Sequence, residues 1–131
     1  MSATSDVKPD KPDLTGSRIL LVEDEYYVAD ELCRALEGCG AEVIGPVPTL
    51  DRALPLAESQ NLTCAVLDIN LRGESCLRIA ETLQRRNVPF VYSTGYSRTS
   101  VPDALNGAAH LEKPFRIEEL LRAVGQASRQ Q

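Results

Sequence analysis

The sequence predicts a doubly wound α/β fold, in which helices cover both faces of one five-stranded parallel sheet. Two patterns lead to this prediction. Short apolar runs alternate with amphipathic, helix-like runs along the chain, and continuous apolar runs are typical of strands that are buried on both faces. Parallel strands also need right-handed crossovers, which the helices between them would supply.

The first strand is expected at 18–22, Arg-Ile-Leu-Leu-Val, because four consecutive apolar residues suit a fully buried strand. A helix is expected over 26–36, where apolar residues fall on one face. Gly38 and Gly40 are expected to end this helix, since glycine tolerates the left-handed backbone common at helix ends. The second strand is expected at about 41–44.

The middle of the chain predicts a helix, a strand and a further helix. The second helix is expected to begin near Thr49, and Pro55 is expected to kink or shorten it because proline lacks a backbone N–H. The third strand is the apolar run 64–67, which ends at Asp68. The next helix is expected at 75–86, with its apolar residues on one face.

The last part of the chain predicts a strand at 90–93, which ends at Thr94, and a strand at 109–112. Between them, the stretch 98–105 has few apolar anchors, and its Pro102 is tolerable only in a first helical turn. This stretch therefore predicts a short helix of marginal stability. The final helix is expected at 117–127.

Length and composition predict one globular domain. Residues 16–131 suffice for a single core, whereas residues 1–15 carry prolines, charges and small polar residues and predict a disordered tail. The net charge of −5 argues against non-specific nucleic-acid binding, which needs a basic face. No apolar run is long enough for a membrane span, and no secretory signal is expected.

The four cysteines, Cys33, Cys39, Cys64 and Cys76, share no C-x-x-C spacing. Only His110 could join them as an imidazole ligand, so a zinc site is not expected. Free thiols that serve as small apolar residues suit a reducing cytosol, and we expect a cytoplasmic protein.

Polar side chains follow four of the five expected strands, at the edge where such sheets bind ligands. Glu23 and Asp24 follow the first strand, Asp68 the third, Thr94 the fourth and Lys113 the fifth. Clustered carboxylates repel one another unless a cation joins them, and an all-oxygen ligand set suits Mg²⁺. A carboxylate can also form an aspartyl-phosphate, whose charge Mg²⁺, an ammonium and a hydroxyl would neutralise. Each residue alone would be an ordinary surface charge or cap, but together they predict a phosphoryl-transfer site.

Four motifs around these residues resemble the receiver domain of response regulators in two-component signalling. The motifs are Leu21-Val-Glu-Asp-Glu25, Val66-Leu-Asp-Ile-Asn70, Ser93-Thr-Gly95 and Glu112-Lys-Pro-Phe115, and the resemblance covers about residues 16–127. It implies a flavodoxin-like βα5 fold in which Asp68 is the phosphoacceptor. It also implies that Mg²⁺ is bound directly by Asp24, through water by Glu23, and by the backbone carbonyl of Asn70. Thr94 and Lys113 would bond the phosphoryl oxygens, and the Lys113–Pro114 peptide bond would be cis.

The same resemblance implies a bacterial single-domain regulator, a phosphoprotein that takes its phosphoryl group from a histidine kinase. The segment Pro89-Phe-Val-Tyr-Ser-Thr-Gly-Tyr96 is similar to stand-alone alphaproteobacterial regulators, whose partners resemble kinases of the HWE type. Many receivers have an aromatic switch residue three places before the lysine, where this chain has His110. The switch is therefore expected at Thr94 and His110, and residues 98–107 are expected to be mobile until Asp68 is phosphorylated.

Two other interpretations were weighed. A small phosphohydrolase with an Asp nucleophile would need a second carboxylate as general acid/base, and position 70 is Asn. A phosphorylation-independent interaction module would not need the carboxylate, hydroxyl and lysine set. The protein is thus not expected to be an enzyme, apart from phosphorylating itself from the donor and slowly losing the group. Contact with an unknown downstream protein, a phosphorelay shuttle and a phosphate sink all stay open as outputs.

Overall fold

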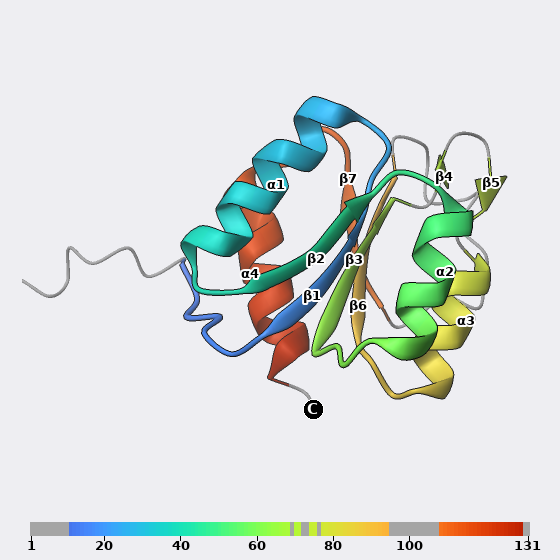
Figure 1. Ribbon diagram of the computed structural model, residues 1–131. Coiled ribbons are helices and arrows are strands. Elements are labelled where there is room, and N and C mark those ends of the chain that lie inside the picture. Colours follow the sequence, from blue (N-terminus) through green and yellow to red (C-terminus); the bar gives the residue numbers. More distant parts are fainter. Residues whose placement is uncertain (1–10, 69, 72–73, 76, 95–107, 130–131) are drawn as a thin grey trace, which may run out of the picture.

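The computed structural model describes residues 11–68, 70–71, 74–75, 77–94 and 108–129, and for residues 70, 71, 74, 75 and 94 it describes the backbone alone. Within these residues, five parallel strands form one sheet in the order β2-β1-β3-β6-β7 (Figure 1). They are β1 (Arg18–Val22), β2 (Glu42–Val47), β3 (Cys64–Asp68), β6 (Phe90–Thr94) and β7 (Ala109–Glu112). A short antiparallel ladder pairs β4 (Asn70–Leu71) with β5 (Glu74–Ser75).

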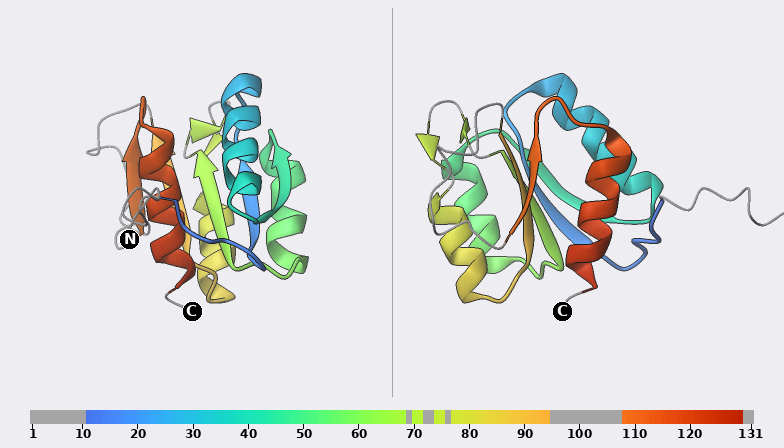
Figure 2. Two further views of the ribbon diagram at one scale, coloured as in Figure 1. Left: turned by 90° about the vertical axis from the view of Figure 1, so that its left-hand side faces the viewer. Right: turned by 180° about the vertical axis from the view of Figure 1, so that it is seen from behind.

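In the described part of the chain, two helices cover each face of the sheet (Figures 1 and 2). α1 (Tyr26–Gly38) packs beside α4 (Ile117–Ser128) on one face. α2 (Leu50–Ser59) packs beside α3 (Leu77–Arg85) on the other face. The predicted fold class, a doubly wound parallel sheet of flavodoxin-like topology, is therefore confirmed.

Side chains of the central strands alternate between two apolar cores. Leu20 and Leu67 belong to the core beneath α2 and α3, whereas Leu21 and Val66 belong to the core beneath α1 and α4. All four side chains are almost completely buried. Because side chains alternate along a strand and both faces of this sheet are covered, β1 and β3 read as continuous apolar runs in the sequence.

Strand β2 differs from its expected range. It begins one residue later and continues to Val47, through Pro46. β2 lies at the edge of the sheet, where a residue without an N–H interrupts no central ladder. Gly45 adopts a φ of +111° before a cis bond to Pro46, and a Cβ at Gly45 would lie 2.9 Å from the carbonyl oxygen of Leu21. A bulkier residue at position 45 would therefore push β2 away from β1.

The helices begin and end for local reasons. α1 ends at Gly38, and the chain turns with a φ of +102° at Gly40, as the two glycines predicted. The Oγ1 of Thr49 accepts a hydrogen bond from the N–H of Arg52 at 3.3 Å and so caps α2. Pro55 does not end α2, which continues to Ser59. α3 begins at Leu77, two residues after the expected start, because Ser75 pairs in β5.

The expected tail of residues 1–15 needs a correction at its end. Leu14 is 2% exposed and belongs to the core beneath α1 and α4, so the packed part of the chain begins before residue 16. Residues 1–10, the expected helix at 98–105 and the expected mobility of 98–107 lie outside the described residues. Among the helices that are described, none is long and apolar enough to cross a membrane.

Candidate functional site

Acidic side chains from two neighbouring strands meet at the carboxyl edge of the sheet. Val22 of β1 pairs with Leu67 of β3, so the residues that follow them, Glu23 and Asp68, lie side by side. One carboxylate oxygen from each of Glu23, Asp24 and Asp68 lies within 4.8 Å of the other two. Glu23 is only 3% exposed and Asp68 only 6% exposed. The structure thus brings together the three carboxylates that the sequence predicted.

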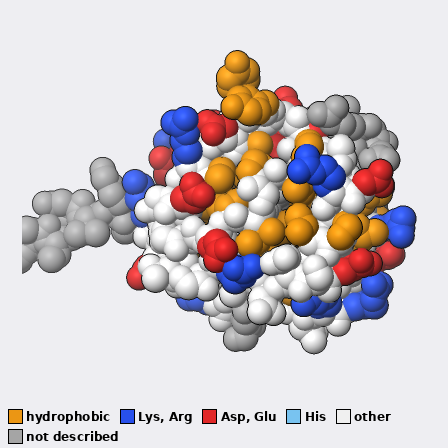
Figure 3. Space-filling view, in the orientation of Figure 1, with side chains coloured by type: hydrophobic (Ala, Val, Ile, Leu, Met, Phe, Trp, Pro, Cys, Tyr) orange, Lys and Arg blue, Asp and Glu red, His pale blue; other side chains and the backbone are white. Residues whose placement is uncertain are grey.

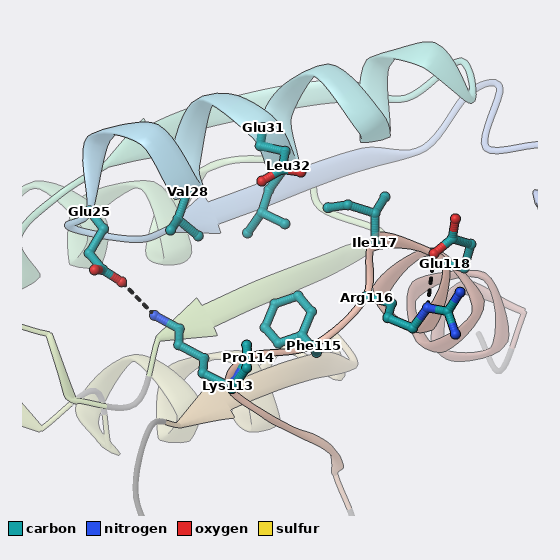
Figure 4. A pocket seen from close by; sticks show the side chains of 10 residues that line it. All are labelled: Glu25, Val28, Glu31, Leu32, Lys113, Pro114, Phe115, Arg116, Ile117 and Glu118. Atoms are coloured by element: carbon teal, nitrogen blue, oxygen red, sulfur yellow. Dashed lines mark hydrogen bonds and ion pairs between the residues drawn. The ribbon is translucent and has the colours of Figure 1, made fainter.

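Lys113 adds one positive charge to this cluster. It follows the last residue of β7, and its Nζ lies 3.3 Å from Oδ2 of Asp68 and 3.2 Å from Oε1 of Glu23. The same Nζ lies 3.2 Å from Oε1 of Glu25. A dashed line marks this ion pair in Figure 4. The Lys113–Pro114 peptide bond is cis. A single ammonium group therefore contacts three carboxylates at once.

Burial and crowding shift the ionisation of these groups. Burial, followed by the charge of Asp68, raises the pKa of Glu23 to about 7, although Lys113 opposes both effects. Burial alone would lower the pKa of Lys113, but the charges of Glu23 and Asp68 raise this pKa overall, so the ammonium stays protonated. The site carries more negative charge than one lysine balances.

A divalent cation fits this set of donors. Carboxylate oxygens are preferred ligands of Mg²⁺ and Ca²⁺, and Glu23, Asp24 and Asp68 offer theirs within one small volume. Two of the three are nearly out of contact with water, so their unbalanced charge is costly without a cation. Mg²⁺ would also bring phosphate oxygens to the same place, because it shares its coordination sphere with phosphate groups.

The sequence matches the response regulator receiver domain over residues 19–125. The chain belongs to this family. The transcriptional regulatory protein PdtaR of Mycobacterium tuberculosis is 28% identical over 111 residues, which make up 82% of this chain and 54% of PdtaR. The chain thus spans about half the length of the curated relatives that it matches.

Solved structures of other receiver proteins share the fold. SdrG from Sphingomonas melonis Fr1 is 37% identical, with a TM-score of 0.74 over 86% of this chain and 95% of SdrG. A response regulator from Burkholderia pseudomallei, with a phosphorylated aspartic acid, a calcium ion and citrate, is 26% identical. Its TM-score is 0.73, over 87% of this chain and 69% of that one.

The two expected switch residues of this receiver domain lie on neighbouring strands. Thr94 ends β6 and pairs with Glu112 of β7, the residue before Lys113. The Thr94 backbone therefore lies at the site edge, while its hydroxyl is outside the described atoms. His110 pairs with Tyr92, and their ring centroids are 4.9 Å apart. Asn70 begins β4, two residues after Asp68.

Glu25 is a site residue that was not predicted from the sequence. Its carboxylate forms an ion pair with Lys113 in the structure. The signal was present, because Glu25 extends the acidic run of Glu23 and Asp24 after the first strand. Glu25 also borders a groove of about 670 Å³ between α1 and the turn that leads into α4 (Figure 4). The apolar lining of this groove is Val28, Leu32, Pro114, Phe115 and Ile117, and its charged lining is Glu25, Glu31, Lys113, Arg116 and Glu118.

A pair of exposed aromatic side chains stands beside the site. Tyr26 and Tyr27, the first residues of α1, are 76% and 84% exposed. Their rings meet edge to face, with centroids 5.3 Å apart. Figure 3 shows hydrophobic side chains standing out from the surface over the start of α1. The sequence predicts a helix start at Tyr26, but it gives no sign that this pair faces solvent next to the acidic cluster.

Proposed function

We propose that Asp68 accepts a phosphoryl group from a histidine kinase, in a reaction that needs Mg²⁺. The contact of the Lys113 ammonium with Asp68, 3.3 Å away within a buried acidic cluster, carries this proposal. Asp24, Asp68 and the Asn70 carbonyl would hold the metal, and Glu23 would bind it through water. The phosphorylated aspartic acid of the Burkholderia pseudomallei relative supports the assignment.

The reaction transfers the phosphoryl group between two side chains. An Asp68 carboxylate oxygen attacks phosphorus, and an O–P bond forms while the N–P bond to the donor histidine breaks. The imidazole leaves in its neutral form after taking a proton from water. Lys113 pairs with the phosphoryl oxygens as their charge moves to Asp68, and the Thr94 hydroxyl donates a hydrogen bond to another of them. Mg²⁺, when bound, neutralises charge on the same oxygens.

The donor protein would dock over the start of α1. A donor histidine must reach Asp68, so its surroundings must contact the surface around the site opening. Tyr26 and Tyr27 offer exposed aromatic area there, the kind of surface that often dominates binding energy. The groove beside them has an apolar lining bordered by Glu25, Glu31 and Glu118. A donor helix with a basic rim would complement these charges.

Intact mass after treatment with a small phosphodonor tests the acceptor. In Mg²⁺, the wild-type chain should gain one phosphoryl group, and Asp68→Asn should gain none. Asp51→Asn, a change at an exposed aspartate of α2, is the matched control and should label like the wild type. Labelling of Asp68→Asn, or undiminished labelling in excess chelator, would refute the proposal and favour a phosphorylation-independent module.

Phosphotransfer from a purified kinase tests the docking surface. Tyr26→Ala with Tyr27→Ala should slow transfer from the kinase by about tenfold or more, the loss expected when an interface anchor is removed. Labelling by the small phosphodonor should stay unchanged, because that donor needs no protein surface. Equal losses with both donors would mean that the tyrosines act on the site itself and not on docking.

We also propose that the partner kinase is of the HWE type and that output occurs through contact with a downstream protein or onward phosphoryl transfer. The resemblance of residues 89–96 to stand-alone alphaproteobacterial regulators supports this class of kinase. The labelling rates of this chain by purified HWE kinases and by other histidine kinases would decide whether the partner kinase is of the HWE type. Faster labelling by kinases outside the HWE class would contradict it.

A further inference from the structure

Residues 11–17, which directly precede β1, run across one face of the molecule. Leu14 is buried beneath α1 and α4, and its N–H donates to the carbonyl oxygen of Cys39 at 2.8 Å. The carbonyl oxygen of Leu14 accepts from the N–H of Ser17 at 2.9 Å. The left view of Figure 2 shows this blue segment running from α4 toward the foot of β1. We call residues 12–17 the strap.

Two glycines on different elements make room for the strap. A Cβ at Gly125 of α4 would lie 2.9 Å from Cβ of Pro12, closer than side-chain atoms can approach. A Cβ at Gly40 would lie 2.6 Å from Oγ1 of Thr15. Gly125 lies in the buried interior of a helix, a position where glycine is normally disfavoured. Its bare backbone therefore forms a notch that Pro12 occupies.

The strap also has internal order. The Oδ1 of Asp13 accepts a hydrogen bond from the N–H of Thr15 at 3.0 Å. This bond turns the chain between the contact at Gly125 and the contact at Gly40. The strap thus connects the end of α1 with the C-terminal half of α4 through a buried leucine and two close approaches to glycine backbone.

Helix α4 links the strap to the phosphoacceptor site. Three residues, Pro114 to Arg116, separate Lys113 from the start of α4. α4 also packs on β3 and β6, the strands that end at Asp68 and Thr94. A shift of α4 would therefore also move Lys113, because only these three residues join the two.

We propose that the strap is an intramolecular restraint on α4, docked by Pro12 in the notch at Gly125, and that this docking sets the position of Lys113. The restraint differs from the proposed phosphoryl transfer, because it acts in the unphosphorylated chain and uses none of the carboxylates of the candidate site. A change that lifts Pro12 from Gly125 would loosen α4 and alter the site from the opposite end of the helix.

A double-mutant cycle in the full chain tests the notch. Gly125→Ala should lower the melting temperature by about 5 °C, although alanine is the better helix former. In a Pro12→Gly background the same change should no longer lower it, because the atoms that alanine would meet are gone. Gly38→Ala is the matched control, since a Cβ at this helical glycine would meet no atom within 4 Å apart from its chain neighbours and the nearby backbone of its own helix. It should leave the melting temperature unchanged or raise it.

Amide measurements test the link to the site without any phosphoryl donor. In Gly125→Ala, hydrogen exchange at Leu14 should accelerate roughly tenfold as the strap loosens, and the Lys113 amide resonance should shift. Gly38→Ala should change neither. If Gly125→Ala stabilises the chain in both backgrounds, the notch does not exist. If Leu14 exchange accelerates while the Lys113 resonance stays in place, the strap does not act on the site and the proposal fails.

Discussion

At the residue scale, Glu23 combines the deepest burial in the described site with close negative charge. It is 3% exposed, lies beside Asp68 and shares the Lys113 ammonium with two other carboxylates. Burial and the charge of Asp68 together raise its pKa to about 7. The metal-free site is therefore strained by its own charge, which is the condition in which a cation binds well.

This strain predicts a pH dependence of stability. The pKa of Glu23 is about 7 in the folded chain and near its ordinary value of 4.5 in the unfolded chain. Between these two values the unfolded chain ionises first, so stability falls as the pH rises through this window. In chelator, the wild type should lose up to about 3 kcal/mol from this group between pH 4.5 and 8.

Thermal unfolding across this pH range measures the effect. Glu23→Gln should flatten the decline, whereas Glu58→Gln, a change at an exposed position of α2, should follow the wild-type curve. Parallel curves for the wild type and Glu23→Gln would show that Glu23 does not carry the pH dependence.

Asp24 predicts how the site responds to metal. Mg²⁺ at ten times its dissociation constant should stabilise the wild type by about 1.4 kcal/mol, because it binds the folded chain alone. Asp24→Ala should lose this gain, yet its metal-free form should be at least as stable as the wild type, since one carboxylate of the crowded set is gone. Denaturant unfolding with and without Mg²⁺ measures both. An undiminished Mg²⁺ gain in Asp24→Ala would remove this residue from the ligand set.

At the element scale, α2 shows that a proline within a helix need not end it. Pro55 removes one N–H from the helix, yet α2 continues to Ser59, whose Oγ donates to the Pro55 carbonyl oxygen at 2.8 Å. The helix is held by its Thr49 cap and by the buried face of Ala53 and Ala57. Local propensity predicted a kinked or shortened helix, and packing against α3 helps to keep α2 helical as far as Ser59.

Replacement of Pro55 tests this balance. Pro55→Ala should restore a backbone hydrogen bond to the carbonyl of Asp51 and raise the free energy of unfolding by about 1–2 kcal/mol. Pro55 is exposed, so little packing is lost. Glu58→Ala in the same helix should change stability by less than about 0.5 kcal/mol. No gain in Pro55→Ala would mean that the helix already accommodates the proline without cost.

The remaining elements show what a sequence can and cannot predict. Strands β1, β3 and β6 fall at or within one residue of their predicted ranges, because a run of apolar residues identifies a strand buried on both faces. β7 also matches its predicted range, although the residues of this edge strand are exposed or half-buried. β2 was misplaced because its proline and glycine are tolerated only at an edge, and strand order is not visible locally. The burial of Leu14 could not be predicted, because a single leucine among polar residues gives no periodic signal.

At the scale of the whole molecule, one site is assembled from distant segments. Glu23, Asp24, Asp68 and Lys113 could be predicted because parallel topology brings strand ends to one edge. The Glu25 contact and the exposure of Tyr26 and Tyr27 could not, since they depend on how α1 leaves β1. The packing of the strap could likewise not be predicted, because its partners Gly40 and Gly125 are far apart in sequence.

Signal propagation is the whole-molecule property that Thr94 should control. Thr94 ends β6 and pairs with Glu112 of β7. A displacement of Thr94 toward the phosphoryl group would therefore shift the backbone of both strands. Thr94→Ala should still accept a phosphoryl group but should show smaller amide shifts along β7 and α4 on phosphorylation. Two-dimensional NMR of the wild type and Thr94→Ala, each with and without the phosphoryl group, measures these amide shifts. Shifts equal to those of the wild type would show that Thr94 is not the coupling residue.

Chemical mapping of the modified residue tests the central claim most directly. The chain is treated with a small phosphodonor and Mg²⁺, reduced with borohydride, which converts an aspartyl-phosphate to homoserine, and then digested for peptide sequencing by mass spectrometry. We predict homoserine at position 68 and at no other carboxylate, with none formed in excess chelator. Homoserine at another position, or its absence at position 68 in a folded chain that binds Mg²⁺, would contradict the account.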